Sequence, residues 1–186
     1  MKKFILFLTI SCSVSIFSQN KSDKFNFDKD GLKPEKIFVD VQGMDKNEML
    51  EKAKDWVKEK TGKSDEIKDD ETEKGKKSKK LKFEGFTHNA ICFTEASEFN
   101  CHDVEFTISI KFEDDGFSFE PKKLSYQTSS KNKKTSLNFK SSDFHSNNGN
   151  LKVDYSKVPS QIESLFNGLS KSLFNYLIDK EQEDEW

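Results

Sequence analysis

Apolar and polar residues alternate through the middle of the chain, which predicts β-strands with one buried face. The clearest run has an apolar residue at every second position, namely Val104, Phe106, Ile108, Ile110 and Phe112. A shorter run of the same kind predicts an earlier strand through Ile37, Val39 and Val41. We therefore expect a sheet with one apolar face.

The dipeptide Asp115-Gly116 follows the long alternating run and is typical of a two-residue type I′ turn. We expect the chain to return antiparallel after it, with Phe112 opposite Phe119 on the core face. The parity of the apolar positions changes after Pro121, which indicates a bulge or a strand end at that point.

A first helix is predicted between Asp45 and Gly62. Asp45 and Glu48 have the spacing of a capping box, and a glycine is a common helix stop. One stripe of this helix is apolar and consists of Met49, Leu50, Ala53, Trp56 and Val57.

A second helix is predicted to begin at Pro159 or Ser160, with Glu163 completing another capping box. Its apolar stripe is wide enough to cover a sheet and consists of Ile162, Leu165, Phe166, Leu169, Leu173, Phe174 and Leu177. Together with the strands, the two helices predict an α+β fold: a curved antiparallel sheet with two main helices packed on one face, as a single domain over residues 36–181.

Cys92 and Cys101 lie opposite each other if a hairpin turns between Ala96 and Ser97. The same register places Ile91 and Phe93 on the face that carries Val104 and Phe106. Two independent patterns thus select one register, and in an oxidising compartment it predicts a disulfide between Cys92 and Cys101. Closing a loop of about ten residues stabilises a fold by roughly 2.7 kcal/mol in the chain-entropy model.

A metal site formed by His88, Cys92, Cys101 and His102 is the alternative interpretation of this hairpin. The predicted register argues against it, because His102 and Cys101 point to opposite faces of the sheet. We therefore predict no metal site, no cofactor site and no catalytic residue, and we expect His102 to be a partly buried core or rim residue.

The first residues have the parts of a secretory signal peptide over 1–18: two lysines at the start, then an apolar run that is too short to span a membrane. No later segment approaches the length of a transmembrane helix. Cleavage is expected after Ser18, and residues 19–35 would then form a leader into the domain. At the other end, residues 182–186 are expected to form an acidic tail. Cys12 offers the alternative of lipid attachment. We expect an exported protein, periplasmic or secreted, or else anchored through Cys12.

The charged residues of the chain argue against a nucleic-acid partner. The chain has 31 basic residues against 33 acidic ones, and every basic residue is a lysine, so no side chain offers the bidentate fork common in phosphate and guanine recognition. An acidic block over 65–73 and a lysine-rich block over 74–82 are expected to fold back as a hairpin with opposite charges facing each other. We therefore expect no nucleic-acid partner.

Residues 128–150 are rich in Ser, Asn and Lys and predict a long exposed excursion. Asn148-Gly149 lies between two weakly apolar segments, 137–139 and 151–155, which indicates a further weak hairpin.

The order of these elements resembles an exported Bacteroidota domain-of-unknown-function family with a TATA-binding-protein-like fold. The resemblance rests on the run from Val39 to Glu48, the helix with Trp56, the turn near Thr72 to Lys76 and the alternating strand that ends at Asp115-Gly116. It covers roughly residues 36–126. It implies a curved antiparallel sheet with helices on one face, and it implies no activity.

The sequence carries no phosphate-binding loop, nucleophile elbow or zinc helix. We therefore expect a non-catalytic envelope protein that binds an unknown protein or small ligand through its sheet face or through the 128–150 loop. The alternative is a carboxylate-based hydrolase of the cell envelope. It has weak support, because the acids fall in solvent-facing positions such as Glu105, Glu113 and Glu120.

Overall fold

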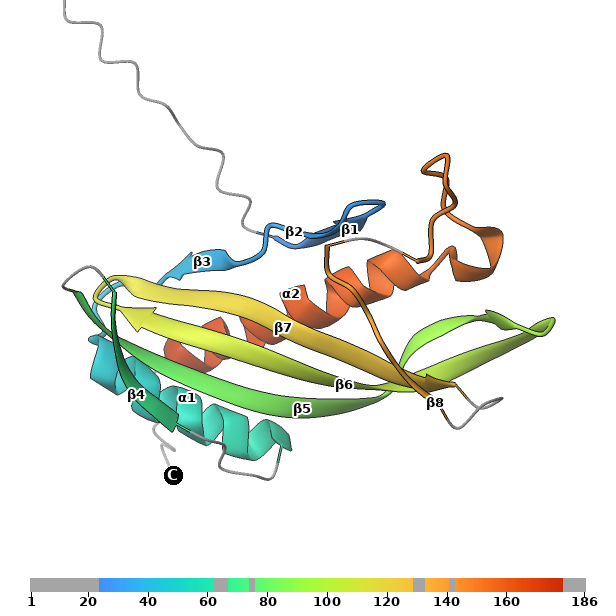
Figure 1. Ribbon diagram of the computed structural model, residues 1–186. Helices are drawn as coiled ribbons and strands as arrows, with labels where there is room; N and C mark the ends of the chain where they lie inside the picture. Colours follow the sequence, from blue (N-terminus) through green and yellow to red (C-terminus); the bar gives the residue numbers. More distant parts are fainter. Residues whose placement is uncertain (1–23, 62–66, 74–75, 129–132, 141–142, 179–186) are drawn as a thin grey trace, which may run out of the picture.

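The computed structural model describes residues 24–61, 67–73, 76–128, 133–140 and 143–178. One antiparallel sheet dominates it, with the strands in the order β3 (Ile37–Asp40), β7 (Gly116–Thr128), β6 (Glu98–Glu113), β5 (Lys76–Glu95) and β4 (Ile67–Glu73). A short strand, β8 (Lys133–Ser136), pairs with the far end of β7. The helices are α1 (Lys46–Thr61) and α2 (Val158–Ile178). Figure 1 shows the long strands running across α2.

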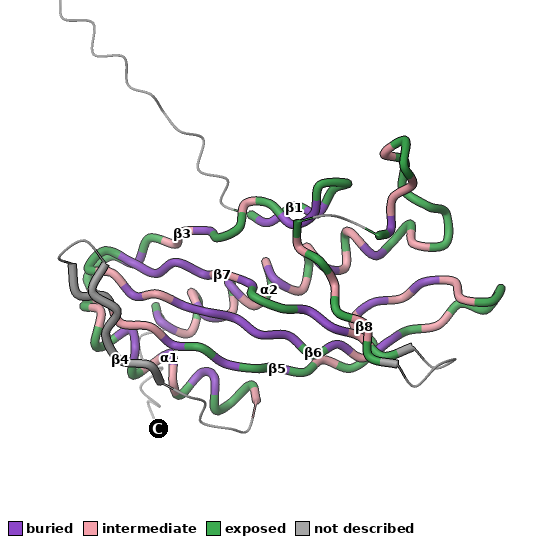
Figure 2. The backbone as a smooth tube through the Cα atoms, viewed as in Figure 1, coloured by how far each residue is buried: buried purple, intermediate pink, exposed green. Residues whose placement is uncertain are grey.

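Both helices cover the same face of the sheet. Trp56 of α1 packs edge-to-face on Phe83 of β5, and Phe166 of α2 packs on Phe106 of β6 in the same way. The apolar positions of the long alternating run in β6 are all buried, as predicted, and buried segments concentrate along the central strands (Figure 2). The predicted α+β architecture is confirmed.

The turn between β6 and β7 differs from the prediction by one residue. Glu113 pairs with Gly116, so the loop is Asp114-Asp115, and Phe112 lies opposite Phe117 rather than Phe119. A Cβ atom at Gly116 would lie 2.2 Å from the carbonyl oxygen of Val39. The glycine is therefore explained by the close approach of β3 and by its positive φ of 154°, which residues with a side chain rarely adopt.

The change of parity after Pro121 is a β-bulge, as predicted. Thr107 pairs with Lys123 and Ile108 pairs with Pro121, so Lys122 is the extra residue. The phenylalanines of β7 and Leu124 consequently both reach the core.

The start of α1 follows the prediction. Oδ1 of Asp45 accepts hydrogen bonds from the backbone N–H groups of Asn47 at 2.7 Å and Glu48 at 3.1 Å. All the residues of the predicted stripe are buried, namely Met49, Leu50, Ala53, Trp56 and Val57. Gly62, the predicted stop, lies outside the described residues.

The cap makes the stability of the fold depend on pH. Hydrogen bonds from Glu48 and then Asn47 lower the pKa of Asp45, so its contribution is complete above the pKa of an unfolded aspartate and is lost as the pH falls through the lower folded value. We expect Asp45→Ala to lower the urea midpoint at neutral pH. Asp45→Asn should keep most of that midpoint, because an amide oxygen also caps a helix, and should remove the pH dependence due to this residue. Equal midpoints for all three proteins at neutral pH would contradict the assignment.

Part of the expected leader over 19–35 belongs to the folded domain. Residues 26–33 form a hairpin of β1 (Asn26–Asp28) and β2 (Gly31–Lys33), and Phe25, Phe27 and Leu32 are buried in the core. Phe25 and Phe27 have the spacing of one face of a strand, but a run of two apolar residues among polar ones is too short to predict a strand, which is why the sequence indicated a leader. The signal peptide over 1–18 and the acidic tail over 182–186 lie outside the described residues.

The start of α2 corrects another prediction. Glu163 does not complete a capping box; its Oε1 atom accepts a hydrogen bond from the backbone N–H of Phe27 at 2.7 Å. Asn167, one turn later, binds both backbone polar groups of Phe25. The polar side chains of this helix thus hold the β1 segment.

The 128–150 segment is less exposed than predicted. β8 pairs with β7, not with residues 151–155, which include a 3-10 helix over Val153–Tyr155. One isolated bridge, between His145 and Leu151, is all that the described residues form of the predicted hairpin. Phe144 is buried beside Phe27 and Tyr155, and Phe139 packs edge-to-face on Phe166 of α2. Two aromatic residues therefore anchor the described part of the segment to the core.

The charged blocks pair as strands β4 and β5, as predicted. Glu73 lies opposite Lys76, whereas Lys68 lies opposite Lys80, so the pairing of opposite charges is only partial. Asp65 lies outside the described residues. Within the described ranges, no helix combines the length and the apolar character needed to cross a membrane.

Candidate functional site

The ends of β5 and β6 form a hairpin arm that projects beyond the helices (Figure 1). Glu95 pairs with Glu98, so the loop is Ala96-Ser97, and Cys92 lies directly opposite Cys101 in the predicted register. A disulfide joins the two cysteines. Their sulfur atoms are therefore not available as thiolate ligands to a metal.

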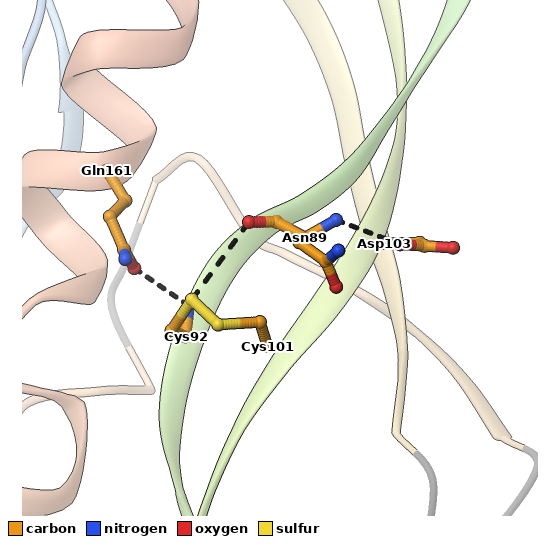
Figure 3. The surroundings of a disulfide bond; sticks show 5 residues. All are labelled: Asn89, Cys92, Cys101, Asp103 and Gln161. Carbon is orange, nitrogen blue, oxygen red and sulfur yellow. Dashed lines mark hydrogen bonds between the residues drawn. A yellow bond between two sulfur atoms is a disulfide. The ribbon is translucent and has the colours of Figure 1, made fainter.

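The base of the arm is fixed on both sides of the sheet (Figure 3). Asn89 lies in the left-handed region with φ 51°, and its N–H donates to Oδ1 of Asp103 at 2.9 Å. The N–H of Cys92 donates to Oε1 of Gln161, on α2, at 2.9 Å. These contacts set the direction of the arm relative to the sheet.

His102 belongs to an aromatic cluster on the buried side of the arm. It is buried and stacks on Phe93 with ring centroids 4.4 Å apart, and Nδ1 lies 3.1 Å from the carbonyl oxygen of Gln127. Tyr126 packs on the same phenylalanine, and burial raises its pKa to about 12. His102 is thus a core residue and is not grouped with His88, which lies on the exposed face with its Nδ1 atom beside a carboxylate oxygen of Asp103.

Two adjoining hollows of about 690 Å³ and about 560 Å³ lie along β5, β6 and β7. The first also borders the end of α1 at Lys60 and Thr61. They share Phe86, Glu105, Ser125 and Lys134, and we refer to them together as the sheet-face hollow. Phe86, Glu105 and Ser125 are successive register partners on β5, β6 and β7. Lys134, on β8, forms an ion pair with Glu105, so the 128–150 segment reaches the same site.

The aromatic side of the hollow is Phe86, which is 51% exposed. His88 packs against it edge-to-face, with ring centroids 4.6 Å apart, and the Nδ1 atom of His88 lies 3.2 Å from a carboxylate oxygen of Asp103. The ring is therefore held in place at the surface by a chain of contacts.

The floor of the hollow is polar and buried. Thr107 and Ser125 are 7% and 1% exposed. Within the described part of the chain, the hydroxyl oxygen of Ser125 has no hydrogen-bond partner. Such a group costs about 1–3 kcal/mol when it stays unpaired, so its presence calls for an explanation.

Gly85 lies on the core side of β5, directly opposite Phe106. A Cβ atom there would lie 2.2 Å from the ring of Phe106, which occupies that space from the core side. The glycine therefore makes room for the ring of Phe106 in the core, while its neighbours Glu84 and Phe86 face outward and line the hollow.

The charges around the hollow balance. Three lysines and three carboxylates line it, namely Lys60, Lys123, Lys134, Glu84, Glu105 and Asp103. A hydrogen bond from the backbone N–H of Asn89, with a smaller contribution from His88, lowers the pKa of Asp103. This carboxylate is therefore held in its ionised form and is poorly suited to act as a general acid.

Sequence reasoning identified Glu105 only as a solvent-facing acid and did not identify Phe86 or Ser125. The sequence did contain a signal for Phe86. It lies at an outward-facing position of β5, between the polar residues Glu84 and His88 at alternate positions. An aromatic residue at an outward position of a strand marks an exposed contact. Ser125 gave no signal, because a serine on the polar face of a strand is ordinary.

Two solved structures are similar to this chain, although no protein-family model and no curated protein matches it. A TBP-like protein from Parabacteroides distasonis is 16% identical, with 78% of this chain and 92% of that chain covered and a TM-score of 0.46. A DUF4468 family protein from Bacteroides ovatus is 12% identical, with 79% and 86% covered and a TM-score of 0.52. The similarity to the DUF4468 family protein is a similarity of fold. The expected resemblance to a Bacteroidota domain-of-unknown-function family is thus confirmed at the level of fold by the DUF4468 family protein.

Proposed function

We propose that this chain is an exported, non-catalytic binding protein of the cell envelope, and that its sheet-face hollow receives a ligand or a partner. The observation that carries the proposal is the buried hydroxyl of Ser125, which has no hydrogen-bond partner among the described residues and lies in the same hollow as the half-exposed ring of Phe86. A ligand that hydrogen-bonds to this hydroxyl while covering the ring would satisfy both.

The balance of charge favours an uncharged polar ligand. A nucleic acid or another polyanion binds where lysines are in excess, because neutralising its charges releases its counterions. Here the number of carboxylates in the lining equals the number of lysines. Lysines and carboxylates side by side can donate and accept hydrogen bonds to a neutral ligand with hydroxyl or amide groups.

Export rests on the signal-peptide pattern over 1–18 and is supported by the disulfide between Cys92 and Cys101, which is typical of oxidising compartments. The intact mass of the protein recovered from its own cell envelope tests this. A mass that begins at Gln19 and lacks two hydrogens is expected. A mass that begins at Cys12 and includes acyl chains would instead make the protein a lipoprotein.

The alternative, a carboxylate-based hydrolase, has a place in the same hollow because Glu84 and Glu105 both line it. Its weakness is that acid catalysis near neutral pH needs a carboxyl group with a raised pKa. Each resolved shift of a carboxyl pKa among the described residues is downward: Asp30, Asp45 and Asp103. Recovery of the bound molecule unchanged after long incubation would count against hydrolysis.

Phe86→Ala is expected to release the ligand of the hollow. Truncating an aromatic anchor costs about 1.4 kcal/mol or more, which is at least a tenfold loss of affinity. Native mass spectrometry of the protein recovered from its own envelope would measure the bound fraction. Phe99→Ala is the matched control, because Phe99 is also an exposed phenylalanine, at 59%, but lies on the arm and does not line the hollow.

The proposal requires an added mass in the wild type and in Phe99→Ala that is strongly reduced in Phe86→Ala. It would be overturned if no protein carried an added mass, or if all three carried the same amount. In the second case the ligand would bind elsewhere on the protein.

A further inference from the structure

Among the described residues that line the sheet-face hollow, Phe86 is the one large apolar side chain that is exposed. Charged side chains lie around it, and two of them, Glu105 and Lys134, belong to both parts of the hollow. A lipid chain would cover these charges without hydrogen-bonding to them, which costs free energy. The lining therefore suits a ligand that offers one small apolar surface and is polar elsewhere.

The strands at the centre of the hollow are paired on both sides. Glu105 of β6 lies between Phe86 of β5 and Ser125 of β7. Ser125 in turn lies between Glu105 and Ser136 of β8. A peptide that binds by strand addition needs an unpaired strand edge, and these positions offer none. Recognition at the centre of the hollow therefore depends on side chains.

The polar side chains at the centre of the hollow complement hydroxyl groups. A carboxylate such as that of Glu105 only accepts hydrogen bonds, and the ammonium group of Lys134 only donates them. The hydroxyl of Ser125, which has no partner in the described part of the chain, can do both. A ligand that matches all three groups must donate and accept at neighbouring positions, as a chain of hydroxyl groups does.

The hydroxyl of Ser125 becomes accessible when the side chains beside it turn aside. Ser125 is 1% exposed, and its neighbour Glu105 forms the ion pair with Lys134. The side chains of that pair are 56% and 45% exposed. An ion pair so exposed contributes little to stability, because water competes for both charges. Exchanging it for hydrogen bonds to a ligand therefore costs little and opens the way to Ser125.

The size of the hollow fits more than one small ring. Its two parts have volumes of about 690 Å³ and about 560 Å³, and each lies within the range of roughly 300–1,000 Å³ that small-ligand sites occupy. Phe86 lines both parts. A ligand centred on Phe86 can therefore extend in both directions along the strands.

We propose that the sheet-face hollow binds a neutral oligosaccharide, with the C–H face of one sugar ring on Phe86 and hydroxyl groups on Ser125, Glu105 and Lys134. A pyranose ring combines a small apolar C–H face, which is attracted to the negative face of an aromatic ring, with a rim of hydroxyl groups. The equal numbers of lysines and carboxylates in the lining favour an uncharged glycan. This inference rests on the proposed function and names the chemistry of its ligand.

Substitutions of Phe86 separate a sugar from an apolar ligand. The probe is an array of neutral glucans, mannans, galactans and N-acetylglucosamine oligomers, with sulfated and uronic acid glycans beside them. Phe86→Leu keeps an apolar side chain but removes the aromatic face, so it should weaken glycan binding about tenfold or more. Phe86→Trp should retain binding, because it keeps an aromatic face. Phe99→Ala is the control on the arm and should bind like the wild type.

Ser125→Ala separates binding from folding. It removes a buried hydroxyl that has no partner among the described residues, so the urea midpoint should stay the same or rise. Glycan affinity should nevertheless fall roughly 2- to 10-fold, the effect of one lost hydrogen bond. A residue that served only the fold would change the midpoint and leave the affinity unchanged.

The ligand itself is identified from the wild-type protein recovered from its own envelope. The molecule released on denaturation is hydrolysed and analysed for monosaccharides. We expect neutral sugars in it, or array binding that Phe86→Leu and Ser125→Ala both weaken. A released molecule that depends on Phe86 but contains no sugar would overturn this inference and leave the proposed function standing.

Two further results on the array would overturn the inference. One is glycan binding that the Phe86 and Ser125 variants leave unchanged, which would place the glycan elsewhere on the protein. The other is binding restricted to sulfated or uronic acid glycans, since the balanced lining selects against charge. The absence of both a released molecule and a bound glycan would overturn the inference and the proposed function together.

Discussion

Replacing Trp56 by alanine is expected to lower the free energy of unfolding by about 3–5 kcal/mol, the range for removing a large aromatic side chain from a core. Trp56 is fully buried. Its ring packs on Phe83 of β5 at 5.6 Å, and its Nε1–H donates to Oγ of Ser172, on α2, at 3.1 Å. One side chain therefore connects the first helix, the sheet and the second helix.

Urea denaturation of three variants separates the two contributions of Trp56. Ser172→Ala removes only the hydrogen-bond acceptor and should cost about 0.5–1.5 kcal/mol. Trp56→Phe keeps an aromatic ring and should fall between Ser172→Ala and Trp56→Ala. A loss below about 1 kcal/mol for Trp56→Ala would contradict the packing described here, because burial of the ring alone accounts for more than that.

Elements with strong local periodicity could be predicted from the sequence. The stripe of α1 was predicted residue by residue, because helical spacing and an N-cap aspartate agree on one set of positions. The register of the arm was predicted because Cys92 opposite Cys101 and Ile91 opposite His102 follow from the same turn. Where two local patterns agree, long-range structure is not needed to choose between registers.

The remaining features depend on contacts between distant segments. Gly116 looked like a turn residue, but β3 passes against it, and nothing near Gly116 in the sequence reveals that approach. Glu163 looked like part of a cap, but it holds Phe27, which is 136 positions away. The sheet-face hollow likewise depends on the pairing of β5, β6 and β7, which brings Phe86 and Ser125 to the two sides of Glu105. The alternation of a sequence indicates which face of a strand a residue occupies. It does not indicate which residue lies beside it on the neighbouring strand.

Reduction of the disulfide, or replacement of both cysteines by serine, is expected to lower the free energy of unfolding by about 2.7 kcal/mol, the chain-entropy value for a loop of about ten residues. The unfolded chain gains that entropy whereas the folded arm keeps its backbone pairing on both sides of Cys92 and Cys101. Urea denaturation with and without reductant measures the difference, and the double serine variant should not respond to reductant. Amide hydrogen exchange should quicken first in the arm.

The base of the arm connects this effect to the sheet-face hollow. Asn89 and Asp103 hold His88 next to Phe86, and all of these residues lie within a few positions of the two cysteines. If the disulfide fixes that geometry, reduction should weaken ligand binding in the hollow while the double serine variant binds as weakly as the reduced wild type. Unchanged binding after reduction would mean that the hydrogen bond from Cys92 to Gln161, together with the Asn89–Asp103 contact, is sufficient to hold the base of the arm.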